Sequence, residues 1–243
     1  MPSNLASRIS SHRRYRLIVY DLDGTLFETL PDLATAVNLA LAERGHRPVV
    51  LEEVRSAIGD GARVLIERLA PAGAGEPEID RILDLFRDHY LVVCRDHSTL
   101  REGAADFVKN RCQDLPGRHQ AILTNKPQAP TDLLVEHGGL SPWIGRALGG
   151  DTPLGRKPVP AGLRDLMHWA GAAAGETLVI GDGPADLAVA QAAGTDSVRI
   201  DGGYGQNLEL DAFPCTWRAG SFTELESLWG RIEPLQDLQV PFH

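Results

Sequence analysis

Four carboxylates follow short apolar runs of this chain. Asp21 and Asp23 come directly after the run LIVY, and Asp182 and Asp186 come after the run TLVIG. Mg²⁺ prefers oxygen ligands at about 2.0–2.1 Å and keeps several waters, so Asp21 and Asp182 are suitable ligands for it. A carboxylate can also attack phosphorus and form an aspartyl-phosphate. The pattern therefore favours phosphoryl-transfer chemistry.

Acid–base and anion-binding groups accompany these carboxylates. Asp23 lies beyond the end of a predicted strand, where it can protonate a departing oxygen and then deprotonate the water that cleaves the intermediate. Thr124 and Asn125 follow the run QAIL, and Lys157 precedes a Pro-rich segment. The Thr124 hydroxyl and the Lys157 ammonium can stabilise the non-bridging oxygens of a phosphate.

Each of these residues alone also fits an ordinary turn, helix cap or solvated surface position. The whole set favours chemistry, because each member stands just past a predicted strand or just before a predicted helix. Ligands of open α/β sheets bind at the carboxyl ends of the strands, so we expect these side chains to meet at one sheet edge.

Short apolar runs alternate with helical patterns in most of the chain, which predicts an α/β fold with a doubly wound, Rossmann-like parallel sheet. The expected strands are 17–20, 120–123, 144–148, 177–180 and 197–200, and the expected helices are 104–111, 131–136, 161–169, 185–193 and 223–229. Helices that start at Pro127, Pro158 and Pro184 would direct free N–H groups to the same edge.

A block of helical patterns interrupts this alternation after the first strand. Its expected helices are 30–41, 51–58, 62–69 and 80–93, with a Gly-rich loop at 71–75. We therefore expect three parts: a flexible tail (1–16), a Rossmann-like core (17–28 and 101–243) and an inserted helical domain (29–100). Packing is the expected role of the segment after Asp211.

Composition limits the classes of partner. The 243 residues carry a formal charge of −9, which argues against nucleic acid or an anionic membrane as the main partner. No apolar run is long enough to span a bilayer. Cys94, Cys112 and Cys215 are far apart and odd in number, so reduced thiols and a cytoplasmic location are expected. The acid-free start of the chain fits a tail better than a transit peptide.

These residues together resemble the haloacid dehalogenase superfamily, and the resemblance covers roughly residues 17–205. It implies that Asp21 is the nucleophile and a metal ligand, and that Asp23 is the acid/base and lends its backbone carbonyl to the metal. It further implies that Asp182 completes the Mg²⁺ site, and that Asp186 contacts metal-bound waters or Lys157. The inserted helices resemble the all-helical (C1-type) cap of that superfamily, which closes over the site.

Several stretches are similar to bacterial phosphoglycolate phosphatases, which implies a small phosphorylated metabolite as substrate, with 2-phosphoglycolate as the best candidate. The loop of the helical block that would set specificity reads Gly59-Asp60-Gly61, with Arg63 close by. Asp60 would repel a glycolate carboxylate unless Arg63 or a water intervenes.

Other readings stay open at this point. Within enzymes they are a phosphosugar or nucleotide phosphatase, a pyrophosphatase and a sugar phosphomutase of the same fold. From a different class, a non-catalytic regulatory or binding protein remains an alternative. Gly183 stands where Ser or Asp is common in the resembling proteins, which predicts a weaker hold on the metal. The sequence does not decide between a monomer and a homodimer.

Overall fold

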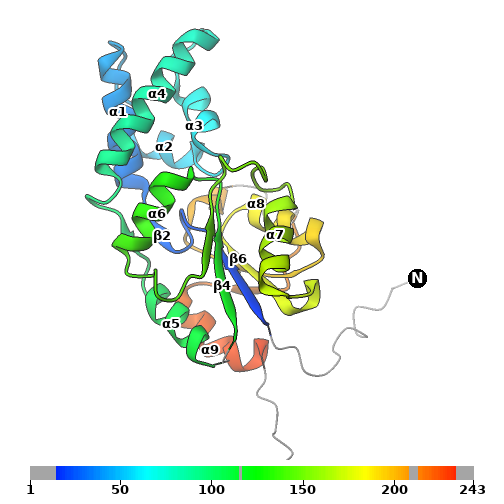
Figure 1. The fold of residues 1–243 in the computed structure, drawn as a ribbon. Helices are drawn as coiled ribbons and strands as arrows, with labels where there is room; N and C mark the ends of the chain where they lie inside the picture. The colour runs from blue at the N-terminus through cyan, green and yellow to red at the C-terminus, as the bar shows by residue number, and fades with distance from the viewer. Residues whose placement is uncertain (1–14, 115–116, 208–212, 234–243) are drawn as a thin grey trace, which may run out of the picture.

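The computed structural model describes residues 15–114, 117–207 and 213–233, and it centres on a six-stranded parallel sheet (Figure 1). The strand order is β5-β4-β1-β6-β7-β8. In chain order the strands are β1 (Leu17–Tyr20), β4 (His119–Leu123), β5 (Arg146–Leu148), β6 (Thr177–Gly181), β7 (Asp196–Ile200) and β8 (Trp217–Ala219). The α/β fold expected from the sequence is confirmed.

The central strands are apolar on both faces because helices cover both. Ile18 and Tyr20 of β1 point to one face and Leu17 and Val19 to the other, and all four side chains are fully buried. Continuous apolar runs of this kind are typical of covered parallel strands. On the first face pack α5 (Ala104–Asp114), α6 (Gln128–His137) and α9 (Phe222–Ile232), and on the second α7 (Ala161–Ala170) and α8 (Pro184–Ala193).

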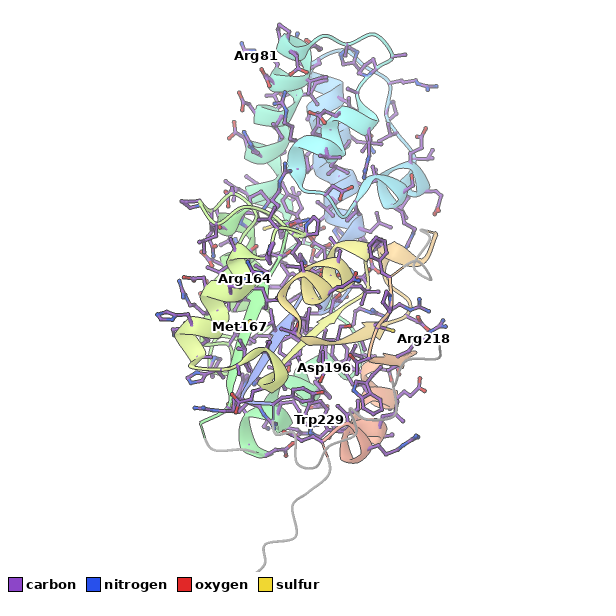
Figure 2. The ribbon with its side chains drawn as sticks, turned by 90° about the vertical axis from the view of Figure 1, so that its right-hand side faces the viewer. Arg81, Arg164, Met167, Asp196, Arg218 and Trp229 are labelled. Atoms are coloured by element: carbon purple, nitrogen blue, oxygen red, sulfur yellow. The ribbon has the colours of Figure 1, made fainter. Side chains whose placement is uncertain are left out.

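Four helices between β1 and β4 form a second apolar cluster of their own. They are α1 (Leu30–Glu43), α2 (Leu51–Ala57), α3 (Ala62–Leu69) and α4 (Glu76–Val93). Figure 2 shows them beyond one end of the sheet, with Arg81 of α4 near the far tip and Trp229 of α9 at the opposite end of the molecule. Two segments join them to the rest of the chain through the antiparallel pair β2 (Phe27–Glu28) and β3 (Thr99–Leu100).

Three helix starts differ from the expected ones by more than one residue, and the first is that of α6, which begins at Gln128 instead of residue 131. The sequence predicts a helix from Pro158, but Pro158 lies in a turn, and α7 begins at Ala161, with Pro160 as its N-cap. Its first main-chain bond runs from the Arg164 N–H to the Pro160 carbonyl. Helix α4 begins at Glu76, four residues earlier than expected, because Pro77 suits a first helical turn.

The ends of the chain add two corrections. Tyr15, assigned to the tail by the sequence, is buried in the core beside Trp229, and the Arg16 N–H donates to the Glu176 carbonyl. Residues 1–14 of the expected tail lie outside the described residues. The sequence does not predict strand β8. The strand has only three residues, and one of them is the exposed Arg218, so it forms no apolar run.

Two global expectations concern membranes and cysteines. Within the described ranges, no helix is both long and apolar enough to cross a membrane. Cys94, Cys112 and Cys215 are free cysteines in this structure, and Cys94 is buried.

Candidate functional site

Adjacent strand ends bring the first two carboxylates together. Strands β1 and β6 pair in parallel, with Tyr20 opposite Ile180, and the Asp21 N–H continues the pairing with a 2.9 Å bond to the Ile180 carbonyl. Asp182 lies one residue beyond Gly181, the last residue of β6. Because the backbone leaves β1 and β6 at the same edge of the sheet, the side chains of Asp21 and Asp182 meet there, as the sequence predicts.

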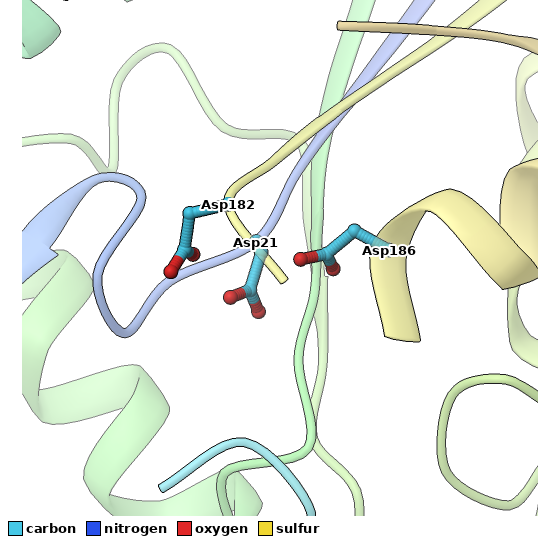
Figure 3. A group of neighbouring side chains, drawn as sticks. All are labelled: Asp21, Asp182 and Asp186. Carbon is cyan, nitrogen blue, oxygen red and sulfur yellow. The ribbon is translucent and has the colours of Figure 1, made fainter. Parts of the chain in front are cut away.

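Three carboxylates converge at this edge. Ligand atoms of Asp21, Asp182 and Asp186 all lie within 4.8 Å of one another, and Figure 3 shows the three side chains pointing toward a common space. Asp186 comes from the first turn of α8, where its Oδ2 accepts the N–H of Gly183, the N-cap, at 3.0 Å. This bond turns the Asp186 carboxylate back toward the ends of the strands.

Lys157 joins two of these carboxylates. Its Nζ donates to Asp21 Oδ1 and to Asp186 Oδ1, both at 2.6 Å, and its side chain is almost fully buried. Burial alone would lower the pKa of Lys157, but Asp186 and Asp21 raise it, so the ammonium stays charged. Lys157 therefore holds a fixed positive charge beside Asp21.

Burial sets the electrostatics of the carboxylates. It raises the pKa of Asp21 to about 6, against the lowering effect of Lys157, and it raises the pKa of Asp182 to about 6, with a further contribution from Asp21. The pKa of Asp186 is also raised, chiefly by burial. Three carboxylates against the single Lys157 ammonium leave an excess of negative charge, which a divalent cation would balance.

Three hydrogen bonds hold the Asp182 carboxylate in one orientation. Its Oδ1 accepts from the Thr25 hydroxyl at 2.6 Å, and its Oδ2 accepts from the N–H groups of Tyr204 and Gly205 at 2.7 and 3.2 Å. A Cβ on Gly203 would lie 2.1 Å from Asp182 Oδ2, so only glycine fits there. An oxygen-only, buried and preoriented donor set of this kind could hold a hard divalent cation.

Asp23 also lines the pocket and has two side-chain partners. Its Oδ1 accepts from the Thr29 hydroxyl at 2.7 Å, and Lys126 Nζ lies 2.8 and 3.0 Å from its two carboxylate oxygens. The same Nζ donates to the Tyr90 hydroxyl of α4 at 2.6 Å. Asp23 thus lines the pocket in a fixed position beside Asp21.

Thr124 and Asn125 follow β4 as expected, and both line the pocket. The Asn125 side chain connects two loops: its Nδ2 donates to the carbonyls of Gly59 and Lys157, and its Oδ1 accepts the Lys157 N–H at 2.8 Å. The structure therefore gives the Asn125 amide a positioning role toward Lys157, and its contact with a phosphate stays a prediction.

Of the four residues expected to set specificity, two line the pocket and two do not. Gly59 and Gly61 line the pocket, whereas Asp60 and Arg63 do not. Asp60 accepts a 2.5 Å bond from Arg68, and Arg63 pairs with Asp80, Glu76 and Glu67 on the outside of the helices. In this structure neither charged side chain faces Asp21.

Residues 15–194 match the family model described as haloacid dehalogenase-like hydrolase. The chain belongs to this family of hydrolases. Curated phosphoglycolate phosphatases are similar to this hydrolase: the one of Pseudomonas putida is 36% identical over 205 residues, covering 81% of this chain and 73% of that protein. The one of Mesorhizobium japonicum is 37% identical over 195 residues, covering 77% of this chain and 83% of that protein.

A solved structure agrees with these relatives. The crystal structure described as a predicted phosphoglycolate phosphatase from Haemophilus somnus superposes with a TM-score of 0.82 at 27% identity, covering 88% of this chain and 98% of that one. The family and its relatives identify the chain as a phosphatase, a phosphoric monoester hydrolase acting on a small phosphorylated substrate.

Sequence reasoning missed three residues of this hydrolase's pocket region. Lys126 directly follows Asn125, but a lysine in a loop gives no signal of burial. Tyr90 lies on α4, and an aromatic residue on the apolar face of a helix indicates only that it packs in the core. Tyr204 donates its N–H to Asp182, and its hydroxyl accepts from the N–H groups of Thr29 and Leu30. All three depend on contacts between distant segments, which one sequence does not reveal.

Proposed function

We propose that the chain hydrolyses a small phosphomonoester through covalent attack by Asp21, with 2-phosphoglycolate as the best candidate substrate. The observation that carries the proposal is the buried cluster of Asp21, Asp182 and Asp186, joined by Lys157 and open to a pocket. The similarity to curated phosphoglycolate phosphatases supports this choice of substrate.

In the proposed reaction an Asp21 carboxylate oxygen attacks phosphorus, and the bond between phosphorus and the ester oxygen breaks. Asp23 gives its proton to that oxygen as the alcohol leaves, and the phosphoryl group stays on Asp21. Asp23 then takes a proton from a water, which cleaves the aspartyl-phosphate and releases phosphate. The Thr124 hydroxyl and the Lys157 ammonium stabilise the charge on the equatorial oxygens.

Asp21, Asp182 and the Asp23 backbone carbonyl would hold Mg²⁺, with Asp186 contacting its waters. When bound, the ion neutralises negative charge on the phosphate and on the carboxylates. We further propose that helices α1–α4 act as a cap that excludes water from the pocket, because Asn125 and Arg156 of the core already contact the Gly59–Asp60 backbone. The cytoplasmic location and the oligomeric state stay predictions.

A phosphate-ester panel with Mg²⁺ tests the proposal. 2-Phosphoglycolate should be cleaved with the highest kcat/KM among small acid, sugar and nucleotide phosphates and pyrophosphate, and a chelator should abolish the activity. Labelled phosphate should appear on the wild-type protein after acid quenching and be absent from Asp21→Asn. If Asp21→Asn keeps its activity, the covalent mechanism is wrong. If no ester is cleaved in the presence of Mg²⁺, a regulatory role is favoured.

A further inference from the structure

One wall of the pocket comes from the helical block and is largely apolar. Leu33, Ile58, Leu65 and Phe86 are among the side chains that the helical block contributes to it. Tyr90 of α4 is the polar residue of this wall, and Lys126, from the core loop after β4, lies directly against it. Among the described residues that line the pocket, Lys126 alone carries a positive charge.

Lys126 is held in a defined place. Its side chain is 2% exposed, its Nζ lies 4.4 Å from the centre of the Tyr90 ring, and it bonds both Asp23 and the Tyr90 hydroxyl. Tyr90 is also 2% exposed, and its hydroxyl hydrogen meets no acceptor among the residues that the structure describes. An ammonium and a phenol O–H, side by side at a pocket wall, form a pair of donors suited to a carboxylate.

The distance from the reacting atoms fixes which part of a substrate meets this pair. Asp23 must lie within about 3.2 Å of the ester oxygen to protonate it. Lys126 Nζ lies 2.8 Å from Asp23. The ammonium is therefore no more than about 6 Å from the ester oxygen, given that reach. A carboxylate one carbon beyond the ester oxygen falls in this zone.

The inference rests on the proposed function and concerns the leaving group. We infer that Lys126 and Tyr90 bind the carboxylate of the leaving group, which makes the enzyme selective for phosphate esters of short 2-hydroxy acids. Lys126 then lies between two carboxylates, those of the substrate and Asp23, and offsets their repulsion. A sugar or nucleoside leaving group would instead place several hydroxyls against a wall that has few polar groups besides Lys126 and Tyr90.

Two esters isolate the role of the carboxylate. 2-Phosphoglycolate carries it, and 2-hydroxyethyl phosphate has a neutral CH₂OH group in its place. The measured quantity is the ratio of kcat/KM for the acid ester to kcat/KM for the neutral ester, in the full-length protein with Mg²⁺. Wild-type protein should prefer the acid ester, because only that ester pairs with the ammonium.

Three variants and one control test the residues. Lys126→Met should reduce the ratio about 10- to 100-fold, as expected for a lost charge-assisted hydrogen bond, mainly through a higher KM for the acid ester. Tyr90→Phe should reduce it by less, about 3- to 10-fold, because a neutral donor is lost. Lys126→Arg should restore part of the ratio. Lys109→Met removes a lysine from the exposed face of α5 and should leave the ratio unchanged.

Each outcome decides the inference. A ratio that stays at the wild-type value in Lys126→Met and in Tyr90→Phe overturns it, and so does an equal fall of kcat for both esters, which indicates a merely structural role. Should Lys126→Met fail to fold, Tyr90→Phe and Lys126→Arg give the same decision. The inferred selectivity is also wrong if the wild-type enzyme hydrolyses an aryl phosphate but has the same kcat/KM for 2-phosphoglycolate and 2-hydroxyethyl phosphate. The covalent mechanism is tested separately, by Asp21→Asn.

Discussion

The two walls of the pocket are built in opposite ways. Behind the wall at the sheet edge stand buried charges that hold one another in place, with Lys157 bonded to Asp21 and Asp186 at 2.6 Å. Among the described lining residues, the wall of the helical block is apolar apart from Tyr90, whose hydroxyl accepts a bond from Lys126 of the core. The difference indicates that the sheet edge performs the chemistry, whereas the helical wall selects the leaving group.

The largest expected effect is at the sheet edge. Lys157→Gln should lower kcat by about 10²- to 10³-fold, because a fixed positive charge on the transferring group is lost. The variant should also melt at a lower temperature, and more so at pH 7.5 than at pH 5, because burial raises the pKa of Asp21 to about 6 and a protonated Asp21 needs no ammonium beside it. Lys109→Gln is the control, and steady-state kinetics with thermal melting is the measurement. A loss below 10-fold in kcat would contradict the assigned role of Lys157.

A change behind Asp182 should have the next largest effect. Gly203→Ala places a Cβ 2.1 Å from Asp182 Oδ2, so the carboxylate must move. A misplacement of this size should reduce kcat/KM by about 10- to 100-fold and raise the Mg²⁺ concentration required for half-maximal activity. Gly175→Ala is the matched control, because a Cβ there meets nothing within 4 Å. Equal activities of the two variants would remove Asp182 from the proposed metal site.

The pH dependence of metal binding tests the same wall without a mutation. The pKa values of Asp21 and Asp182 are raised to about 6 in the folded chain, above the unfolded value of about 3.9. These groups therefore contribute stability that is fully present below about pH 4 and is lost as the pH rises through about 6. A divalent cation must replace their protons, so its stabilising effect should grow over this window.

Differential scanning calorimetry measures that effect. At Mg²⁺ about 100 times above its dissociation constant, binding adds about 2.7 kcal/mol to the stability of the folded chain. This corresponds to roughly 5–10 °C in Tm for a chain of this size at pH 7.5. The shift should be much smaller at pH 5 and absent from an Asp182→Asn variant. A Tm shift of equal size at both pH values would contradict binding of the ion by these carboxylates.

The smallest effect is expected on the outside of the helical block. Arg63→Ala removes solvent-exposed ion pairs, which contribute little to stability, at a residue that does not line the pocket. The kcat/KM for 2-phosphoglycolate should therefore stay within about 3-fold of wild type, on the scale of such pairs. A larger fall would restore Arg63 to the specificity role that the sequence predicts and would place the selective wall in the Gly59–Arg63 loop.

The two walls also differ in how much of them the sequence reveals. Asp21, Thr124 and Asp182 were predictable because each ends an apolar run, and parallel strands bring their carboxyl ends to one edge. The position of Lys126 was not, because it depends on Tyr90 reaching it from α4, more than thirty residues away in the chain. The directions of Asp60 and Arg63 were hidden for the same reason, since their partners lie on other turns of the helical block.

Tyr204 links the start of the inserted helices to Asp182. Its main-chain N–H holds Asp182, while its hydroxyl binds the backbone N–H groups at Thr29 and Leu30, where α1 begins. A rotation of α1 about this point would pull on the residue that orients the carboxylate. The position of the inserted helices is therefore coupled to the orientation of Asp182 through one tyrosine.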